Sequence, residues 1–251
     1  MTIKAVFNLP FLEQIAFFRK KLNVPTARWD DLWKDQHAKG FMIAGAMKAD
    51  LLNDFRQAVD KAIAGKSTLA DFRKDFDKIV ERHGWSYKGG RNWRTRVIYD
   101  TNVRQSFNAG RWEQLTDPDV KAHYGYLIYR HGDSVQPRPD HLAWDGTVLP
   151  VDDPWWNTHM PQNGWGCKCK VFAATKEEHQ AAGNKGQPPA APIDKKTGEP
   201  VGIDKGFGYN VGKAKMEQSH KILESAAARL PKDLAAKLRA EIAAYSGVNN
   251  A

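Results

Sequence analysis

The 251-residue sequence has only two cysteines, too few for the disulfide framework that stabilises small secreted domains. They are spaced as Cys167-x-Cys169, and cysteines two positions apart rarely bridge each other because the closed ring is strained. The sequence also lacks an apolar run of the roughly 18–20 residues that a membrane-spanning helix needs. We therefore expect reduced thiols or metal ligands in a protein that is made in the cytoplasm and does not enter a membrane.

The sequence also lacks the motifs that indicate common classes of enzyme. The sequence contains no phosphate-binding loop, no nucleophile elbow and no metalloprotease helix motif. We therefore name no catalytic residue and predict that the protein is not an enzyme. Apolar residues make up 41% of the chain, which is enough to bury a sizeable core in one or two domains.

Acidic residues are scarcer than basic ones, 29 against 38, which gives a formal net charge of +9. The excess is concentrated in residues 88–111, where Asp100 is the one acid. A basic helix there would suit nucleic-acid phosphates, with Arg91, Arg94, Arg96 and Arg104 as the contacts. The alternative is a solvated face whose arginine stems pack on the core.

Apolar periodicity predicts helices through most of residues 1–115. We expect helices from Pro10 to Leu22, from Thr26 to Gly40, from Asp50 to Ala64, from Thr68 to His83, and a long helix ending near Leu115. Thr68 and Asp71 resemble a capping box that would open the fourth of these. Trp93, Val97 and Phe107 are predicted to mark the buried face of the long helix.

Residues 116–212 change character and predict a small β-containing, loop-rich region. Strands are expected at Tyr124–Arg130 and Val171–Ala173, and a hairpin turn is expected between Ile193 and Val201. Residues 213–251 then predict two alanine-rich helices, Lys213–Leu230 and Lys232–Tyr245, separated by Pro231. The fold class predicted from this order is α+β, mainly helical at the N-terminal side.

The stretch from Asp133 to Cys169 mixes metal-capable side chains, turn formers and four tryptophans. His141, Cys167 and Cys169 could bind zinc, with a fourth ligand from the set Asp133, Asp140, His131 and His159. A second interpretation makes Cys167 a nucleophile and His141, oriented by Asp140, its base. The favoured interpretation is structural: buried tryptophans, glycine and proline turns and ion pairs hold the loops in one shape.

The same stretch carries the pattern D-x4-R-x2-H-x4-G followed by W-x4-P-x-N-G-W-x-C-x-C. It is formed by Asp133, Arg138, His141, Gly146, Trp156, Pro161, Asn163, Gly164, Trp165, Cys167 and Cys169. This signature resembles that of phage Mu F-like minor head proteins. Further similarity at Arg96–Arg111 and at Phe207–Asn210 extends the resemblance over about residues 7–212.

The resemblance implies a minor head protein of a tailed phage or prophage that acts in procapsid morphogenesis. It implies a location in the virion head or procapsid. It also implies association with portal, scaffold and major capsid proteins, and a link to DNA packaging. The alternative is a zinc-dependent or Cys/His-dependent hydrolase, or a nuclease-like effector, carried in the virion.

Overall fold

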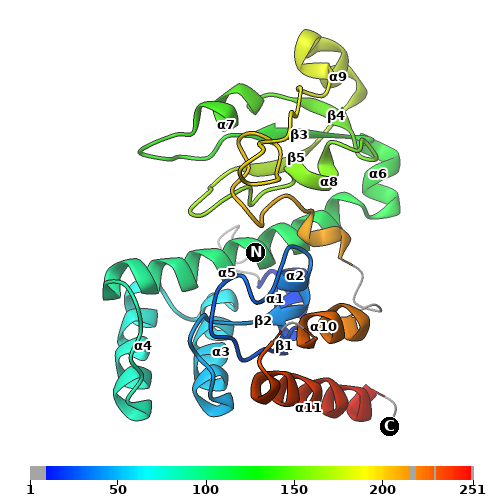
Figure 1. Cartoon of the computed structure of the whole chain (residues 1–251). Coiled ribbons are helices and arrows are strands. Elements are labelled where there is room, and N and C mark those ends of the chain that lie inside the picture. The colour runs from blue at the N-terminus through cyan, green and yellow to red at the C-terminus, as the bar shows by residue number, and fades with distance from the viewer. Residues whose placement is uncertain (1–9, 215–218, 229, 250–251) are drawn as a thin grey trace, which may run out of the picture.

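A computed structural model of the protein describes residues 10–214, 219–228 and 230–249. Its elements form two lobes on either side of one long helix, α5 (Arg91–Leu115), as Figure 1 shows. Helices fill one lobe, and a small sheet with short helices fills the other. This arrangement confirms the predicted α+β class and the helical N-terminal region.

The helical lobe is built on α1 (Leu12–Arg19), α3 (Ala49–Ile63) and α4 (Leu69–His83), packed against α5. Their apolar faces meet in a core that includes Phe18, Phe55 and Phe76, all fully buried. The capping box at Thr68 is confirmed: its side chain accepts from the Asp71 N–H, and Asp71 bonds back to the Thr68 N–H. The predicted limits of α3 and α4 hold to within about two residues.

The helix predicted from Thr26 to Gly40 is wrong for most of its length. Only α2 (Gln36–Lys39) is helical, and the preceding residues form turns. The carboxylate of Asp31 accepts bonds from the N–H groups of Ala27 and Arg28, and these local bonds compete with a helix. The loop is flanked by β1 (Leu22–Asn23) and β2 (Gly40–Phe41), which pair in parallel.

Helix α5 ends where expected, but its buried face differs from the prediction. Trp93 is 58% exposed, because the first turn of the helix extends past the core, and the ring lies over Gly89 instead. Thr95 and Ile98 are buried there in its place. Farther along, Gly110 lets the backbone of α1 approach closely, since a Cβ at this position would lie 2.6 Å from the Gln14 nitrogen.

The second lobe contains an antiparallel sheet in the order β4-β3-β5. Its strands are β3 (Tyr126–Arg130), β4 (Val148–Pro150) and β5 (Lys170–Ala174), and the two predicted strands are β3 and β5. Strand β4 was not predicted, because three residues are too few to show an alternating pattern. The remaining elements are α6 (Pro118–Tyr124), α7 (Pro139–Trp144), α8 (Trp156–His159), α9 (Lys176–Ala181) and the 3-10 turn η2 (Gly183–Gly186).

The core of this lobe is rich in indole rings. Trp144, Trp155 and Trp156 are buried with Tyr129 of β3, and Cys167 and Cys169 belong to the same core. Trp165 was expected to be buried with them, but 41% of it is exposed. The predicted hairpin between Ile193 and Val201 is nearly as found, since Ile193 pairs with Pro200.

The chain then returns to the helical lobe. The 3-10 turn η3 (Val211–Lys213) packs on α5, and α10 (Ser219–Ala227) and α11 (Lys232–Asn249) follow. Of the helix predicted from Lys213 to Leu230, residues 215–218 and 229 lie outside the described part. Leu223 and Leu238 pack with Leu22 and Leu32 of the first lobe. Within the described residues, none of the helices is both long and apolar enough to cross a bilayer.

Candidate functional site

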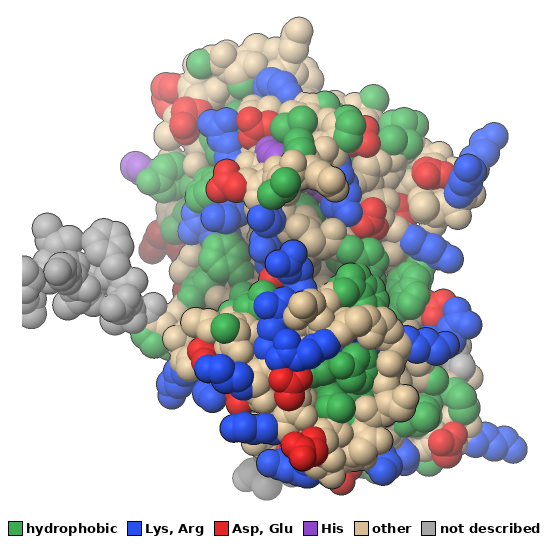
Figure 2. All heavy atoms as spheres, turned by 90° about the vertical axis from the view of Figure 1, so that its left-hand side faces the viewer, with side chains coloured by type: hydrophobic (Ala, Val, Ile, Leu, Met, Phe, Trp, Pro, Cys, Tyr) green, Lys and Arg blue, Asp and Glu red, His purple; other side chains and the backbone are tan. Residues whose placement is uncertain are grey.

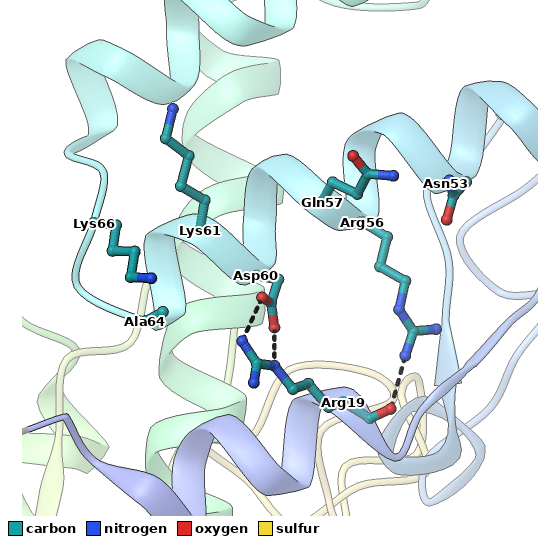
Figure 3. A pocket seen from close by; sticks show the side chains of 8 residues that line it. All are labelled: Arg19, Asn53, Arg56, Gln57, Asp60, Lys61, Ala64 and Lys66. Carbon is teal, nitrogen blue, oxygen red and sulfur yellow. Dashed lines mark hydrogen bonds and ion pairs between the residues drawn. The ribbon is translucent and has the colours of Figure 1, made fainter.

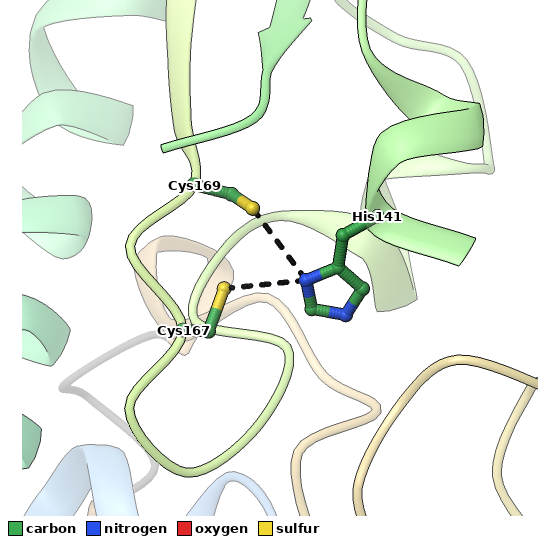
Figure 4. A group of neighbouring side chains, drawn as sticks. All are labelled: His141, Cys167 and Cys169. Atoms are coloured by element: carbon green, nitrogen blue, oxygen red, sulfur yellow. Dashed lines mark hydrogen bonds between the residues drawn. The ribbon is translucent and has the colours of Figure 1, made fainter. Parts of the chain in front are cut away.

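Helix α7 and the segment before β5 bring His141, Cys167 and Cys169 together in the second lobe (Figure 4). His141 lies on α7, Cys167 follows the turn at Gly164, and Cys169 directly precedes β5. Proline at the first position of α7 fits the start of a helix, because its missing N–H would have no partner there. The three predicted metal ligands therefore converge, with His141 from one segment and both cysteines from another.

The sulfur and nitrogen atoms of this cluster are close to one another. The Nδ1 atom of His141 lies 3.7 Å from the Cys167 Sγ and 3.5 Å from the Cys169 Sγ. All three ligand atoms lie within 4.8 Å of one another, and all three residues are buried. Both cysteines are free thiols rather than a disulfide.

The second nitrogen of His141 has a different partner. Its Nε2 lies 2.8 Å from the carbonyl oxygen of Gly202, which can only accept a hydrogen bond. Nε2 therefore carries the ring hydrogen, and the Nδ1 lone pair faces the two sulfur atoms. The imidazole also stacks on Trp144 at a centroid distance of 4.9 Å, which fixes its plane.

Proximity changes the acidity of the two thiols in opposite directions. Hydrogen bonding between the sulfur atoms lowers the pKa of Cys169 and raises the pKa of Cys167, and burial raises the pKa of Cys167 further. Burial also raises the pKa of the neighbouring Tyr129 well above its ordinary value. The two thiols therefore differ in acidity, and Cys169 is the more acidic of the pair.

A cavity of about 270 Å³ opens on one side of the cluster. Besides the three clustered residues it is lined by His131, Ser134, Gln136, Arg138, Trp165, Gly166 and Lys168. The lining that the structure describes contains no aspartate or glutamate. Asp140 does not belong to it, so the predicted pairing of His141 with an Asp140 carboxylate is not seen among the described contacts of His141.

The other candidate ligands lie apart from the three atoms. His131 lines the cavity, and its backbone N–H donates to Asp145. His159 is buried against Trp155, with stacked rings 4.1 Å apart, and burial lowers its pKa to about 4. Asp133 is exposed, and its backbone carbonyl, not its carboxylate, accepts a bond from the Lys168 ammonium.

The remaining signature residues hold the loops around the cluster. The Arg138 guanidinium donates to Asp204 at 2.8 Å and to the Trp165 carbonyl at 3.1 Å. Trp156 is fully buried, and its indole N–H donates to the Pro150 carbonyl. Gly146 adopts a left-handed φ of 79° at the turn before β4, and Pro161 is buried.

Sequence reasoning missed two residues that support the site, Gly202 and Asp204. Gly202 accepts the His141 hydrogen bond, and Asp204 accepts from both Arg138 and the Trp165 N–H. Both follow the signature by more than 30 positions, in a loop without a motif of its own. Gly202 acts through its backbone carbonyl and Asp204 through a single carboxylate, so neither belongs to a spaced motif that could have identified it.

The four arginines proposed to contact nucleic acid do not form one free row. Arg91 pairs with Asp77 at 2.6 Å, and Arg94 is half-buried, donates to the Ala44 carbonyl and lies over Trp85. Arg104 lies 3.9 Å from Asp100, whereas Arg96 is exposed and makes no hydrogen bond or ion pair with the described residues. Figure 2 shows basic side chains in a band down one face, with acidic ones beside them.

A second hollow of about 430 Å³ lies on the helical lobe, between the end of α1 and α3 (Figure 3). It is lined by four basic side chains, Arg19, Arg56, Lys61 and Lys66, and one acid, Asp60. Arg19 makes a two-pronged ion pair with Asp60, and Arg56 donates to the Arg19 carbonyl. Arg19 and Arg56 therefore link α1 to α3 across the groove.

Comparison with known proteins shows what the chain is similar to. Residues 53–172 match the model of the family described as phage Mu protein F like protein. A protein of Escherichia phage Mu, assigned by its name to capsid assembly as protein F, is 30% identical over 181 residues, which cover 66% of this chain and 40% of that protein. The Mu-like prophage FluMu F protein of Haemophilus influenzae is 29% identical over 223 residues, covering 75% of this chain and 53% of the relative.

The chain thus spans about half or less of the length of these curated relatives. No solved structure matches it. The family match ends just beyond Cys169, so it includes most of α3, all of α4 and α5, strands β3 and β4, and all eleven positions of the signature. Together these matches show that the chain is similar to the phage Mu protein F-like proteins, with the family model matching over residues 53–172.

Proposed function

We propose that this chain acts in phage head morphogenesis as a component that binds other proteins of the procapsid. The observation that carries the proposal is the similarity to the phage Mu protein whose name assigns it to capsid assembly. The matched region includes α5, which lies between the two lobes, and every residue of the signature. Portal, scaffold and major capsid proteins are the partners we propose, with the procapsid or virion head as the location.

Surface chemistry supports a binding role. Trp93 and Val135 are large apolar side chains that remain exposed, 58% and 98% respectively, at the start of α5 and on the loop before α7. Tryptophan is enriched at the energetic centres of protein interfaces, because it buries a large area at a small cost in side-chain entropy. Trp93 is therefore our candidate contact residue for a head protein.

The test is incorporation into procapsids. The full chain would be co-expressed with the head proteins encoded beside it, and procapsids would be isolated and analysed by mass spectrometry. We expect the wild-type chain to co-sediment with them and Trp93→Ala to reduce its amount several-fold. Leu12→Ala, at another exposed apolar position, is the matched control and should leave incorporation unchanged.

Head assembly without any uptake of the wild-type chain would overturn the proposal. Equal uptake of wild type and Trp93→Ala would keep the head role but remove Trp93 from the interface. A hydrolase remains the alternative, and the cavity beside Cys167 is where its chemistry would occur. Since the described lining offers no carboxylate base, His141 would take that role, and hydrolysis by the wild type no higher than that of His141→Ala would remove this alternative.

Contact with DNA is a further proposal and would involve fewer arginines than the sequence suggested. Because Arg91, Arg94 and Arg104 contact other parts of the protein, Arg96 is the strongest of the four candidates. Binding to duplex DNA should weaken steeply as salt rises, in proportion to the number of phosphates contacted. A flat salt response of the purified chain would count against it.

A further inference from the structure

We propose that His141, Cys167 and Cys169 bind a zinc ion, with the fourth coordination position facing the cavity. Thiolate sulfur and imidazole nitrogen are the ligands that zinc prefers. With Zn–S bonds of about 2.3 Å and Zn–N bonds of about 2.0–2.1 Å, a tetrahedral site places sulfur and nitrogen roughly 3.6 Å apart. The observed Nδ1–Sγ distances of 3.5 and 3.7 Å agree with that separation.

The orientation of the imidazole supports the same conclusion. The Nε2–H of His141 donates to the Gly202 carbonyl at 2.8 Å, so Nδ1 is the unprotonated nitrogen. A backbone carbonyl or carboxylate on the far nitrogen of a histidine is the usual outer partner of a zinc ligand, because it fixes the tautomer and the ring plane. Stacking on Trp144 restrains the ring a second time.

A purely hydrogen-bonded cluster is the competing explanation for three neighbouring polar groups in a core. The Nδ1 atom has one in-plane lone pair, yet two sulfur atoms lie at contact distance from it. One lone pair accepts one well-directed S–H bond, so in a hydrogen-bonded cluster the second S–H would have to point at the other sulfur, which is a weak acceptor. A cation shared by the three atoms accounts for their convergence on one point, because each ligand then directs its own lone pair at the ion.

The surroundings indicate where a fourth ligand would bind. The cluster is closed by Trp144 and Tyr129 on the core side and borders the 270 Å³ cavity on the other. Three protein ligands with an open position are typical of zinc sites that keep a water or an exchangeable ligand. His131 lines this cavity but does not belong to the group of three, so we assign the fourth position to water.

Zinc bound here would hold the loop from Gly164 to Cys169, the signature loop, in place. The ion would join α7 to the residues before β5, and the loop between Gly164 and Cys169 would be held on either side by Asp204 and the metal. Trp165 in this loop contacts Trp29 of the helical lobe. Metal binding would therefore stabilise the contact between the two lobes.

The first experiment measures metal in the full-length chain purified without chelator. We expect about one zinc per chain by elemental analysis. Replacement of the zinc by cobalt should give the intense visible bands of a tetrahedral site and a sulfur-to-cobalt charge-transfer band in the near ultraviolet. Chelation should remove the metal and lower the melting temperature, and added Zn²⁺ should restore it.

Variants separate the ligands from their neighbours. Cys167→Ser and Cys169→Ser should each lose most of the bound metal, and each should lose part of the charge-transfer band in cobalt-loaded protein. His131→Ala, a matched control from the same cavity, should keep the zinc and the spectrum. The circular dichroism of each variant shows whether it still folds.

Several results would overturn the proposal. These are wild-type protein that takes up neither zinc nor cobalt, a cobalt complex without a sulfur band, or equal metal loss in His131→Ala and Cys167→Ser. Should the serine variants fail to fold, the cobalt spectrum and the chelator-dependent melting of the wild type still decide the question. The procapsid assay is independent of these readouts, so the head role and the zinc site can fail separately.

Discussion

The ring of Trp165 packs edge-on against the ring of Trp29, with centroids 6.0 Å apart and planes at 83°. Trp165 belongs to the signature loop, and Trp29 belongs to the turns that precede α2 in the helical lobe. Trp165 also packs on Phe207 at 5.0 Å, and the buried Glu199 pairs with Lys34 across the same junction. The signature thus contributes to the contact between the lobes as well as to the cluster around His141.

This relationship leads to a prediction about Asp204, which holds Trp165 in place. Its carboxylate accepts from the Trp165 N–H and from Arg138, both at 2.8 Å. We expect Asp204→Ala to lower the free energy of unfolding by about 1–2 kcal/mol, since hydrogen bonds to a charged group are lost but the ion pair is one-third exposed. Chemical denaturation followed by tryptophan fluorescence measures the change.

A surface ion pair provides the control for Asp204. Asp152 pairs with Lys121 at 2.7 Å, but its side chain is 77% exposed and no backbone group donates to it among the described residues. Asp152→Ala should change stability by less than about 0.5 kcal/mol. Equal losses in the two variants would mean that Asp204 does not anchor the loop.

Two arginines near the start of α5 should behave differently. Arg94 donates to the Ala44 carbonyl and covers the ring of Trp85, so Arg94→Ala should cost about 1–3 kcal/mol of stability through lost packing and an unpaired carbonyl. Arg96 is exposed, and Arg96→Ala should stay within about 0.5 kcal/mol of wild type. Thermal unfolding of both variants at one pH gives the comparison, and a larger loss in Arg96→Ala would contradict it.

The sequence was a good guide where local chemistry decides the structure. Thr68 and Asp71 formed the expected capping box, and the apolar spacing of α3 and α4 placed both helices. It failed between Thr26 and Gln36, where tryptophans at helical spacing lie in turns capped by Asp31. There the hydrogen bonds of the Asp31 side chain to the backbone favour turns over a helix, and the apolar pattern is too short to predict which of the two forms.

The site was partly predictable for a similar reason. The residue types and short spacing of Cys167 and Cys169, with His141 nearby, pointed to a ligand group before any distance was known. Gly202 was not predictable, because what it contributes is a backbone carbonyl that every residue type possesses. The charge of residues 88–111 likewise could not show which arginines are engaged by Asp77, Ala44 or Asp100.

Lys21 should make stability depend on pH. It is buried, and burial together with the nearby charges of Arg56 and Lys39 lowers its pKa from 10.5 to about 7. Between these values the unfolded chain binds a proton that the folded chain has lost, so this residue makes stability rise with pH, by up to about 1.4 kcal/mol per unit. Below about pH 7 both states are protonated and the contribution is constant.

The measurement is the difference between wild type and Lys21→Met, because other groups titrate in the same range. We expect the wild type to gain stability relative to Lys21→Met as the pH rises from about 7 to 10. The Lys21 ammonium donates to the His37 carbonyl at 2.7 Å, so the variant also loses a bond, which shifts the whole curve but not its slope. Parallel curves for the two proteins would show that Lys21 keeps an ordinary pKa.

Gly132 provides the sharpest test of how the cysteine segment is positioned. A Cβ at Gly132 would lie 2.0 Å from the carbonyl oxygen of Lys168, the residue between the two cysteines, and this backbone atom cannot rotate away. Gly132→Ala should therefore push β3 and the cysteine segment apart and cost about 1–3 kcal/mol of stability. Gly90→Ala is the control, because a Cβ there meets nothing within 4 Å and the φ of −72° suits alanine. If chemical denaturation finds Gly132→Ala as stable as Gly90→Ala, the close approach of Gly132 to Lys168 does not fix the position of the cysteine segment.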